Sequence, residues 1–209
     1  MKTVLIISMT IFLAATQRPS GSSPSTNRPV ILGFGDSLTA GFGVAREGGY
    51  PDQLQQSLDQ RGYRYRVVNM GISGDTTSGG IARLRAGLDL KPSFVILELG
   101  ANDGLRGLPV KETRANLEEM IAAFQKTGAT VVLAGMTLPR NYGATYVQAF
   151  EDIFKDLSRK YNLPLIPFFL EGVAGIPRLT LPDFIHPNAD GYRIVTDNIL
   201  KTLGPLLKK

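Results

Sequence analysis

The stretch Pro29-Val30-Ile31-Leu32-Gly33-Phe34-Gly35-Asp36-Ser37-Leu38-Thr39 decides how this chain folds. Its apolar run, Val30–Phe34, is typical of a strand that is buried on both faces of a parallel sheet. The residues that follow predict a tight glycine-bearing turn that leads into a helix. Because ligands of open α/β sheets bind at the carboxyl ends of the strands, Ser37 is expected at an edge where a site can form. Alternatively, Asp36 or Ser37 only caps the helix.

The chain beyond this stretch repeats the order of strand, loop and helix. Apolar runs predict four more buried strands, at residues 65–70, 94–99, 130–136 and 165–169. Helical patterns occupy residues 51–60, 77–88, 110–126, 144–161 and 188 to about 203. Five strands that alternate with helices predict right-handed crossovers and a parallel sheet covered on both faces. We therefore expect one three-layer α/β/α domain.

Charge and composition exclude several classes of protein. The formal net charge is +5, but three of the basic residues lie in the first 28 positions, and residues 29–209 carry 20 basic against 18 acidic side chains. This balance does not imply nucleic-acid binding. The chain has no cysteine, which removes disulfides, thiolate nucleophiles and zinc–thiolate sites. Its single histidine, His186, excludes a histidine-rich metal site and must carry any histidine-dependent acid–base chemistry.

The sequence of the first 28 residues is typical of a targeting segment. Residues 1–15 combine a positive start, an apolar stretch and a small-residue end, which is typical of a secretory signal peptide. The peptide ends at residue 15 or extends to about residue 20. It is short for a membrane span, although an uncleaved anchor is the alternative because the cleavage site is not a clean A-x-A. Residues 16–28 are rich in Ser, Pro and Thr and predict a flexible linker. We expect a periplasmic or secreted protein.

Glycines and polar residues gather at four places that follow predicted strands or precede the last helix. Each place also has a simple structural explanation as a turn, an Asx turn or a cap. The first three follow parallel strands, so the fold would bring them to the same edge of the sheet. The four segments are Asp36-Ser37, Gly71-Ile72-Ser73-Gly74-Asp75, Gly100-Ala101-Asn102-Asp103-Gly104 and Asp183-Phe184-Ile185-His186-Pro187.

Together these segments supply the groups that acyl transfer needs. A serine hydroxyl such as that of Ser37 is a weak nucleophile until a base takes its proton, and His186 is the one imidazole available. Asp183 can orient that imidazole and stabilise the imidazolium that forms. The backbone N–H groups of Ser37 and Gly74 and the side-chain amide of Asn102 are candidates for the oxyanion hole.

These residues resemble a known family. They match, in order, the four sequence blocks of the SGNH (GDSL) hydrolases. Longer stretches, at residues 68–76, 98–107, 138–143 and 164–169, resemble its bacterial periplasmic branch of arylesterases, acyl-CoA thioesterases and lysophospholipases. The blocks are Gly35-Asp36-Ser37-Leu38, then Gly74, then Gly100-x-Asn102-Asp103, then Asp183-x-x-His186-Pro187.

The resemblance assigns residues 29–209 to one SGNH hydrolase domain. It implies a flavodoxin-like sheet, no metal or cofactor, and hydrolysis of esters and thioesters of acyl chains through an acyl-enzyme on Ser37. We expect a small-molecule ester or thioester as substrate, no stable membrane span after processing, and a monomer. The departures at Gly71 and at residues 172–177 bear on substrate preference rather than on the chemistry.

Apolar residues in the loops near these segments predict a groove for the acyl chain. They fit a hydrophobic core equally well, and exposed apolar side chains at a crevice edge favour a ligand. The candidates are Leu105, Leu108, Leu138, Tyr142, Ile176 and Leu179.

Two other functions could use the same glycine turns or the same four blocks. A flavodoxin-like nucleotide-binding module would also use glycine turns, but the third glycine of a Rossmann fingerprint is Leu38 here, and the chain has no P-loop sequence. The G-x-S-x-G elbow of the α/β-hydrolases is absent as well. A carbohydrate O-deacetylase could use the same four blocks, and only its groove would differ.

Overall fold

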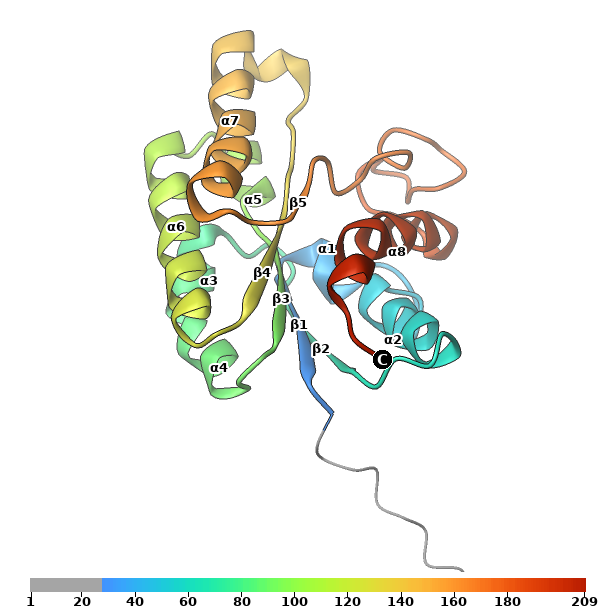
Figure 1. Cartoon of the computed structure of the whole chain (residues 1–209). Helices are drawn as coiled ribbons and strands as arrows, with labels where there is room; N and C mark the ends of the chain where they lie inside the picture. Colours follow the sequence, from blue (N-terminus) through green and yellow to red (C-terminus); the bar gives the residue numbers. More distant parts are fainter. Residues whose placement is uncertain (1–27) are drawn as a thin grey trace, which may run out of the picture.

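A five-stranded parallel sheet with the order β2-β1-β3-β4-β5 forms the centre of the molecule (Figure 1). This computed structural model describes residues 28–209, so the predicted signal peptide and nearly all of the predicted linker lie outside the described residues. The sheet confirms the predicted fold class. The strands are β1 (Val30–Gly35), β2 (Arg66–Gly71), β3 (Phe94–Glu98), β4 (Thr130–Ala134) and β5 (Leu165–Ile166).

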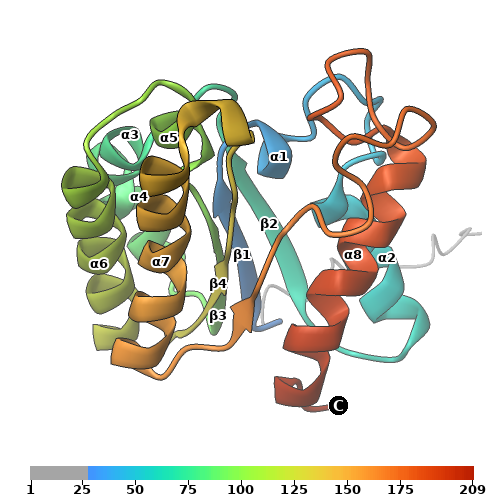
Figure 2. The same ribbon diagram turned by 90° about the horizontal axis from the view of Figure 1, so that it is seen from above.

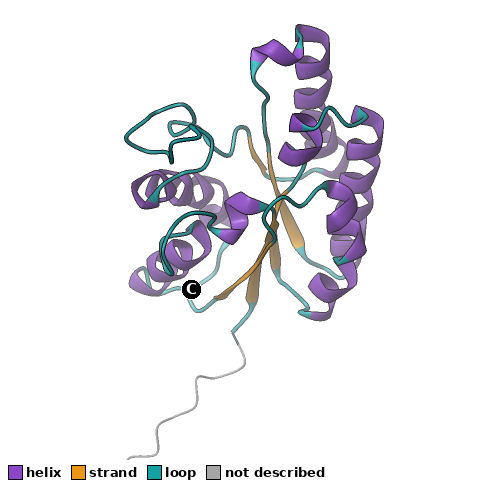
Figure 3. Ribbon diagram, turned by 180° about the vertical axis from the view of Figure 1, so that it is seen from behind, coloured by secondary structure: helices purple, strands orange, loops and turns teal. Residues whose placement is uncertain are grey.

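Helices cover both faces of the sheet, as Figure 2 shows from above. Helices α1, α2 and α8 lie on one side, and α3 to α7 lie on the other. A long segment without regular structure connects β5 to α8 (Figure 3). The helices are α1 (Ser37–Ala40), α2 (Tyr50–Gln60), α3 (Thr77–Ala82), α4 (Leu84–Asp89), α5 (Ala101–Leu105), α6 (Val110–Lys126), α7 (Ala144–Tyr161) and α8 (Ala189–Leu203), with 3-10 turns η1 (Arg140–Tyr142) and η2 (Gly204–Leu206).

The core lies on both faces of the central strands. β1 and β3 are buried along their whole length, which accounts for their unbroken apolar sequences. On one face Phe34 packs edge-on against Phe124 of α6, with ring centroids 5.5 Å apart. On the other face Tyr50 of α2 meets Phe169 in the same geometry at 5.5 Å. The core therefore fixes β1 and β3, the two strands that lead into the first and third polar segments.

Three predicted elements differ from the structure. β2 is an edge strand whose residues are partly or fully exposed, so the prediction of a buried strand there was wrong. The predicted helix at 77–88 is two helices, which meet at Arg83. The predicted strand at 165–169 pairs regularly with β4 only over Leu165 and Ile166, and beyond them the backbone N–H of Phe169 donates to the Gly135 carbonyl oxygen at 2.8 Å outside the strands.

Candidate active site

Ser37 is the first residue of α1, and only Asp36 separates it from the end of β1. Asp36 caps this helix, because its Oδ1 accepts a hydrogen bond from the backbone N–H of Leu38 at 3.0 Å. The capping explanation that the sequence offered therefore applies to Asp36, and the Ser37 hydroxyl is left for another partner.

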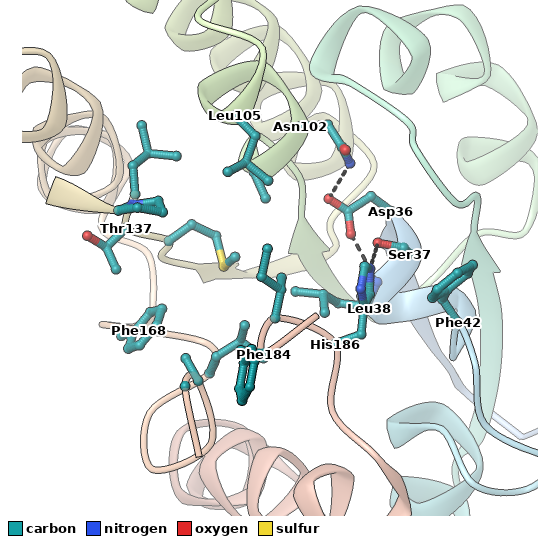
Figure 4. A pocket seen from close by; sticks show the side chains of 18 of the residues that line it. Asp36, Ser37, Leu38, Phe42, Asn102, Leu105, Thr137, Phe168, Phe184 and His186 are labelled. Carbon is teal, nitrogen blue, oxygen red and sulfur yellow. Dashed lines mark hydrogen bonds between the residues drawn. The ribbon is translucent and has the colours of Figure 1, made fainter. Parts of the chain in front are cut away.

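That partner is the imidazole of His186, 149 residues further along the chain. The Oγ of Ser37 lies 2.8 Å from Nε2 of His186 (Figure 4). Nδ1 of the same ring lies 2.6 Å from Oδ2 of Asp183. The three side chains form one hydrogen-bonded line. This is the geometry in which a serine can pass its proton to an imidazole that a carboxylate orients.

Asp183 and His186 lie in a short turn that precedes α8. The N–H of Leu181 donates to the carbonyl oxygen of His186 at 2.8 Å, which closes the turn. Within it, Oδ1 of Asp183 accepts from the backbone N–H groups of Ile185 at 3.0 Å and His186 at 2.9 Å. One oxygen of Asp183 thus shapes the turn while the other orients the imidazole.

The charged form of Asp183 is favoured in this turn. Partial burial alone would raise the pKa of the carboxyl group, but the hydrogen bonds from the His186 ring and from the two backbone N–H groups outweigh it. The pKa of Asp183 is consequently lowered below its ordinary value. A carboxylate that stays ionised can stabilise an imidazolium beside it.

One aromatic ring packs against the imidazole, and a second lines the same cavity. The ring centroid of Phe42 lies 4.7 Å from that of His186. Phe184, which lines the cavity, is 52% exposed. Its φ of +61° is a left-handed conformation that costs a bulky residue about 1 to 3 kcal/mol.

Ser37 and Gly74 each present a backbone N–H at the site. Within residues 28–209 neither N–H has a hydrogen-bond acceptor. Gly74 has a φ of +79°, and an added Cβ would meet only Arg106 Nη2, at 3.6 Å. Glycine is thus required at position 74 because of the positive φ, and not because a side chain would clash with its neighbours. The Arg106 guanidinium donates to the Gly74 carbonyl oxygen at 2.7 Å and holds this peptide in place.

The side-chain amide of Asn102 completes the group of candidate donors. Asn102 lies in the first turn of α5, after β3, and its Nδ2 donates to Asp36 Oδ2 at 3.0 Å and to the Asp75 carbonyl oxygen at 2.9 Å. Strands β1 and β3 are neighbours, and the chain leaves β1 toward β2 on its other side, so the two turns meet at the point where the strand order reverses. The fold thus brings together all five sequence-predicted residues.

Two polar residues that support the site, one partly buried and one fully buried, had no assigned role in the sequence analysis. Arg83 forms an ion pair with Asp75 at 2.7 Å and also donates to the carbonyl oxygens of Met70 and Gly35, which ties the ends of β2 and β1 together. Asp103 accepts from the N–H of Thr77 at 2.8 Å and joins α5 to α3. These partners are 8 to 48 residues apart in the chain, so local patterns could not reveal them.

A cavity of about 570 Å³ opens beside Ser37 and His186 (Figure 4). Its size is within the range of small-molecule sites, and most side chains that line it are apolar. Two of them, Phe184 and Ile185, lie inside the Asp183-x-x-His186 segment, where their apolar character was a usable signal. The apolar lining residues absent from the predicted groove include Phe42, Met136, Phe168, Leu170, Phe184 and Ile185.

Two of the six predicted groove residues, Leu105 and Leu138, line this cavity. The other four do not. Leu179 is buried in the core, and the hydroxyl of Tyr142 turns to the carbonyl oxygen of Leu105 at 2.9 Å. Leu108 and Ile176 are partly buried outside the lining.

No group of three or more His, Cys, Asp or Glu side chains in residues 28–209 is arranged to hold a metal ion.

Comparison with known proteins identifies the family. Residues 34–194 match the model of the GDSL-like lipase/acylhydrolase family. Esterase TesA of Pseudomonas aeruginosa is 43% identical over 178 residues, which are 85% of this chain and 89% of the relative. Thioesterase 1/protease 1/lysophospholipase L1 of Escherichia coli K12 is 38% identical over 85% of this chain and 84% of its own. A crystal structure of TesA superposes with a TM-score of 0.82, at 42% identity and with 85% and 99% of the two chains covered.

The chain therefore belongs to the GDSL-like lipase/acylhydrolase family, as its sequence blocks predicted. It is an ester hydrolase by class. None of the helices described in residues 28–209 is both long enough and apolar enough to cross a membrane.

Proposed function

We propose that this protein is a serine esterase that hydrolyses acyl esters and thioesters through an acyl-enzyme on Ser37. One observation carries the proposal. The hydrogen-bonded line of Ser37, His186 and Asp183 ends at the mouth of a cavity lined mainly by apolar side chains.

The proposed reaction begins with attack by the Ser37 hydroxyl on the substrate carbonyl carbon. As the new C–O bond forms, the hydroxyl proton moves to Nε2 of His186, and the carbonyl electrons move onto the carbonyl oxygen. When the intermediate collapses, the bond to the alcohol or thiol breaks and the leaving group takes the proton from Nε2. Water then attacks the acyl-enzyme in the same way, and Ser37 recovers its proton.

Three donors stabilise the oxyanion in this mechanism. The N–H groups of Ser37 and Gly74 are available, and the Asn102 amide is held beside them by Asp36 and Asp75. Donors fixed in advance stabilise developing charge without reorganisation during the reaction.

The cavity favours an acyl chain over an acetylated sugar. A sugar site needs hydrogen-bonding groups for several hydroxyls, whereas the side chains distant from Ser37 are mainly apolar, such as Met136, Phe168 and Leu170. The relatives, which are named as an esterase and a thioesterase/lysophospholipase, support the same class of substrate. The carbohydrate O-deacetylase is therefore the second candidate.

Replacing Ser37 by alanine tests the proposal. Ser37→Ala should lower kcat for a p-nitrophenyl ester by at least ~1000-fold, because no nucleophile remains. An organophosphate should label the wild-type protein and not this variant. Ser158→Ala, which removes a hydroxyl from α7 away from the cavity, is the matched control and should keep full activity. Ser37→Ala with wild-type kcat would overturn the proposal.

We also propose that the enzyme is exported as a monomer. Residues 1–15 carry the pattern of a secretory signal peptide, and residues 29–209 form the catalytic domain.

A further inference from the structure

Glu98 is a buried acid that contacts the turn between β1 and Ser37. It is the last residue of β3, and none of it is exposed to solvent. Its Oε2 accepts from the Thr39 hydroxyl at 2.8 Å and from the backbone N–H of Asp36 at 3.3 Å. Its Oε1 receives no hydrogen bond from any donor in residues 28–209. An ionised carboxylate with one unsolvated oxygen is strongly disfavoured in such a place.

Room for this side chain depends on Gly35. A Cβ at Gly35 would lie 2.0 Å from the Thr39 hydroxyl oxygen and 2.5 Å from Glu98 Oε2, distances at which atoms overlap. The absence of a side chain at Gly35 therefore leaves room for the hydrogen bond between Thr39 and Glu98 next to the Ser37 turn. A purely apolar core would not need this arrangement.

The carboxyl group of Glu98 faces that of Asp36. Burial raises the pKa of both groups, and the negative charge of Asp36 raises that of Glu98 further. Asp36 is the better site for a negative charge, because it accepts from the Leu38 N–H and from the Asn102 amide. The proton of the pair therefore belongs on Glu98, which has fewer donors to stabilise a negative charge.

We propose that Glu98 is a positioning residue that stays protonated in the active enzyme and holds Asp36, and through Asp36 the amide of Asn102, in place. A protonated Glu98 donates to the Asp36 carboxylate, and its Oε2 accepts the Asp36 N–H and the Thr39 hydroxyl. This links β3, the Ser37 turn and Asn102 in one network. The proposal rests on the proposed esterase function of that site.

The other titratable groups around the pair come from four further places in the fold. Tyr50 of α2 contacts the Thr39 hydroxyl at 3.1 Å, and Tyr192 of α8 lies near both carboxyl groups. The pKa of each tyrosine is raised, first by its burial, so both remain neutral. His186 faces Asp36 from the turn before α8, and the Arg83 guanidinium reaches the Gly35 carbonyl oxygen from the junction of α3 and α4.

Glu98→Gln tests the protonation state of Glu98. The side-chain amide of glutamine resembles a protonated carboxyl group, because it is neutral and has one accepting and one donating side. The variant should retain kcat/KM within about threefold at pH 7. Unfolded wild-type chains release the Glu98 proton near its ordinary pKa of 4.5, whereas the folded protein retains it to a higher pH. Wild-type stability therefore falls with rising pH across that interval, and glutamine removes this loss. The Tm of Glu98→Gln relative to wild type should rise as pH increases above 4.5.

Glu98→Met tests the positioning role because it keeps the volume and removes every hydrogen bond. It should lower kcat by ~10-fold or more with KM within about twofold, because the misplaced donors act on the transition state. Tyr50→Phe is the control. It removes a buried hydroxyl that contacts Thr39 and has no hydrogen bond to Asp36 or Glu98, and it should lower Tm but keep kcat within about twofold.

Three results would overturn the proposal. They are a loss of more than tenfold in kcat of Glu98→Gln at pH 7, a Tm difference for that variant that does not change with pH, and a Glu98→Met enzyme with wild-type kcat. If Glu98→Met does not fold, the two readouts of Glu98→Gln decide. Active Ser37→Ala would remove the esterase mechanism, but the pH dependence of Tm would still report whether Glu98 carries a proton.

Discussion

Asn102 donates to Asp36 through the same Nδ2 that donates to the backbone of Asp75, at 3.0 Å and 2.9 Å. An amide nitrogen has two hydrogens, so both are already engaged within the protein. These bonds fix the plane of the amide beside Ser37. An oxyanion must then share one of the hydrogens with an existing acceptor, in a three-centre bond of the kind that is common in proteins.

Asn102→Ala separates the two functions of this side chain. We expect kcat to fall by ~100-fold or more with little change in KM, because the donor acts only on developing charge. We also expect a loss of roughly 1 kcal/mol in the free energy of unfolding, because Asp36 and Asp75 each lose a donor. Steady-state kinetics on a short p-nitrophenyl ester and a thermal melt measure the two effects.

Asn116→Ala is the control for Asn102→Ala. The Asn116 amide also donates to a neighbour, the Thr77 hydroxyl at 3.1 Å, but Asn116 does not line the cavity. It should lower Tm and leave kcat within about twofold. If Asn102→Ala behaved in the same way, the oxyanion hole would be reduced to two backbone donors.

The fold was predictable where burial dominates the sequence. β1 and β3 are covered on both faces, so nearly every residue is apolar and the runs are visible. The edges were less predictable. The runs at β2 and β5 look similar, but β2 is half exposed and β5 lasts two residues, because the neighbours of an edge strand are set by tertiary contacts.

The site was predictable only in part, for a related reason. Four local segments supplied Ser37, Asn102 and Asp183, because chemistry restricts the residue types there. The support of these residues depends on contacts between distant parts of the chain. Glu98 and Asp36 are 62 residues apart, and Glu98 lies in a run of apolar residues that looks like an ordinary buried strand. The cavity walls come from loops whose paths the sequence pattern does not determine.

Asp183→Asn tests the orientation of the imidazole. An asparagine can still accept the two backbone N–H groups that shape the turn, but its amide nitrogen would face Nδ1 of His186 and favour the wrong tautomer. We expect kcat to fall by ~1000- to 10,000-fold with Tm nearly unchanged. Asp190→Asn changes an exposed acid of α8 that pairs with Arg193, and it should have wild-type kcat. Equal activity of the two variants would exclude Asp183 from the proposed mechanism.

Removal of the first 26 residues tests the proposed export signal. A shortened chain that begins at Asn27 retains Arg28, which pairs with Asp59 of α2 at 3.0 Å. We expect this chain to be soluble in the cytoplasm and to keep the kcat/KM of the exported enzyme within about twofold. The full chain should be found outside the cytoplasm and shorter by roughly 15 to 20 residues, as mass spectrometry can measure. An insoluble or inactive shortened chain would place the removed segment within the fold.

The length of acyl chain that the enzyme accepts should depend on Thr137. Thr137 and Phe168 lie at the end of the cavity away from Ser37 and His186 (Figure 4), so a long chain would reach them and an acetyl group would not. Thr137→Trp should lower kcat/KM for a long-chain p-nitrophenyl ester by ~10-fold or more, because the lost methylene contacts contribute about 1 to 3 kcal/mol each. The acetate ester should change less than twofold. Thr137→Val loses the same hydroxyl, which donates to Glu151, at nearly constant size, and should leave both substrates unaffected. If Thr137→Trp lowered the rates of both esters equally, the acyl chain would not occupy this end of the cavity.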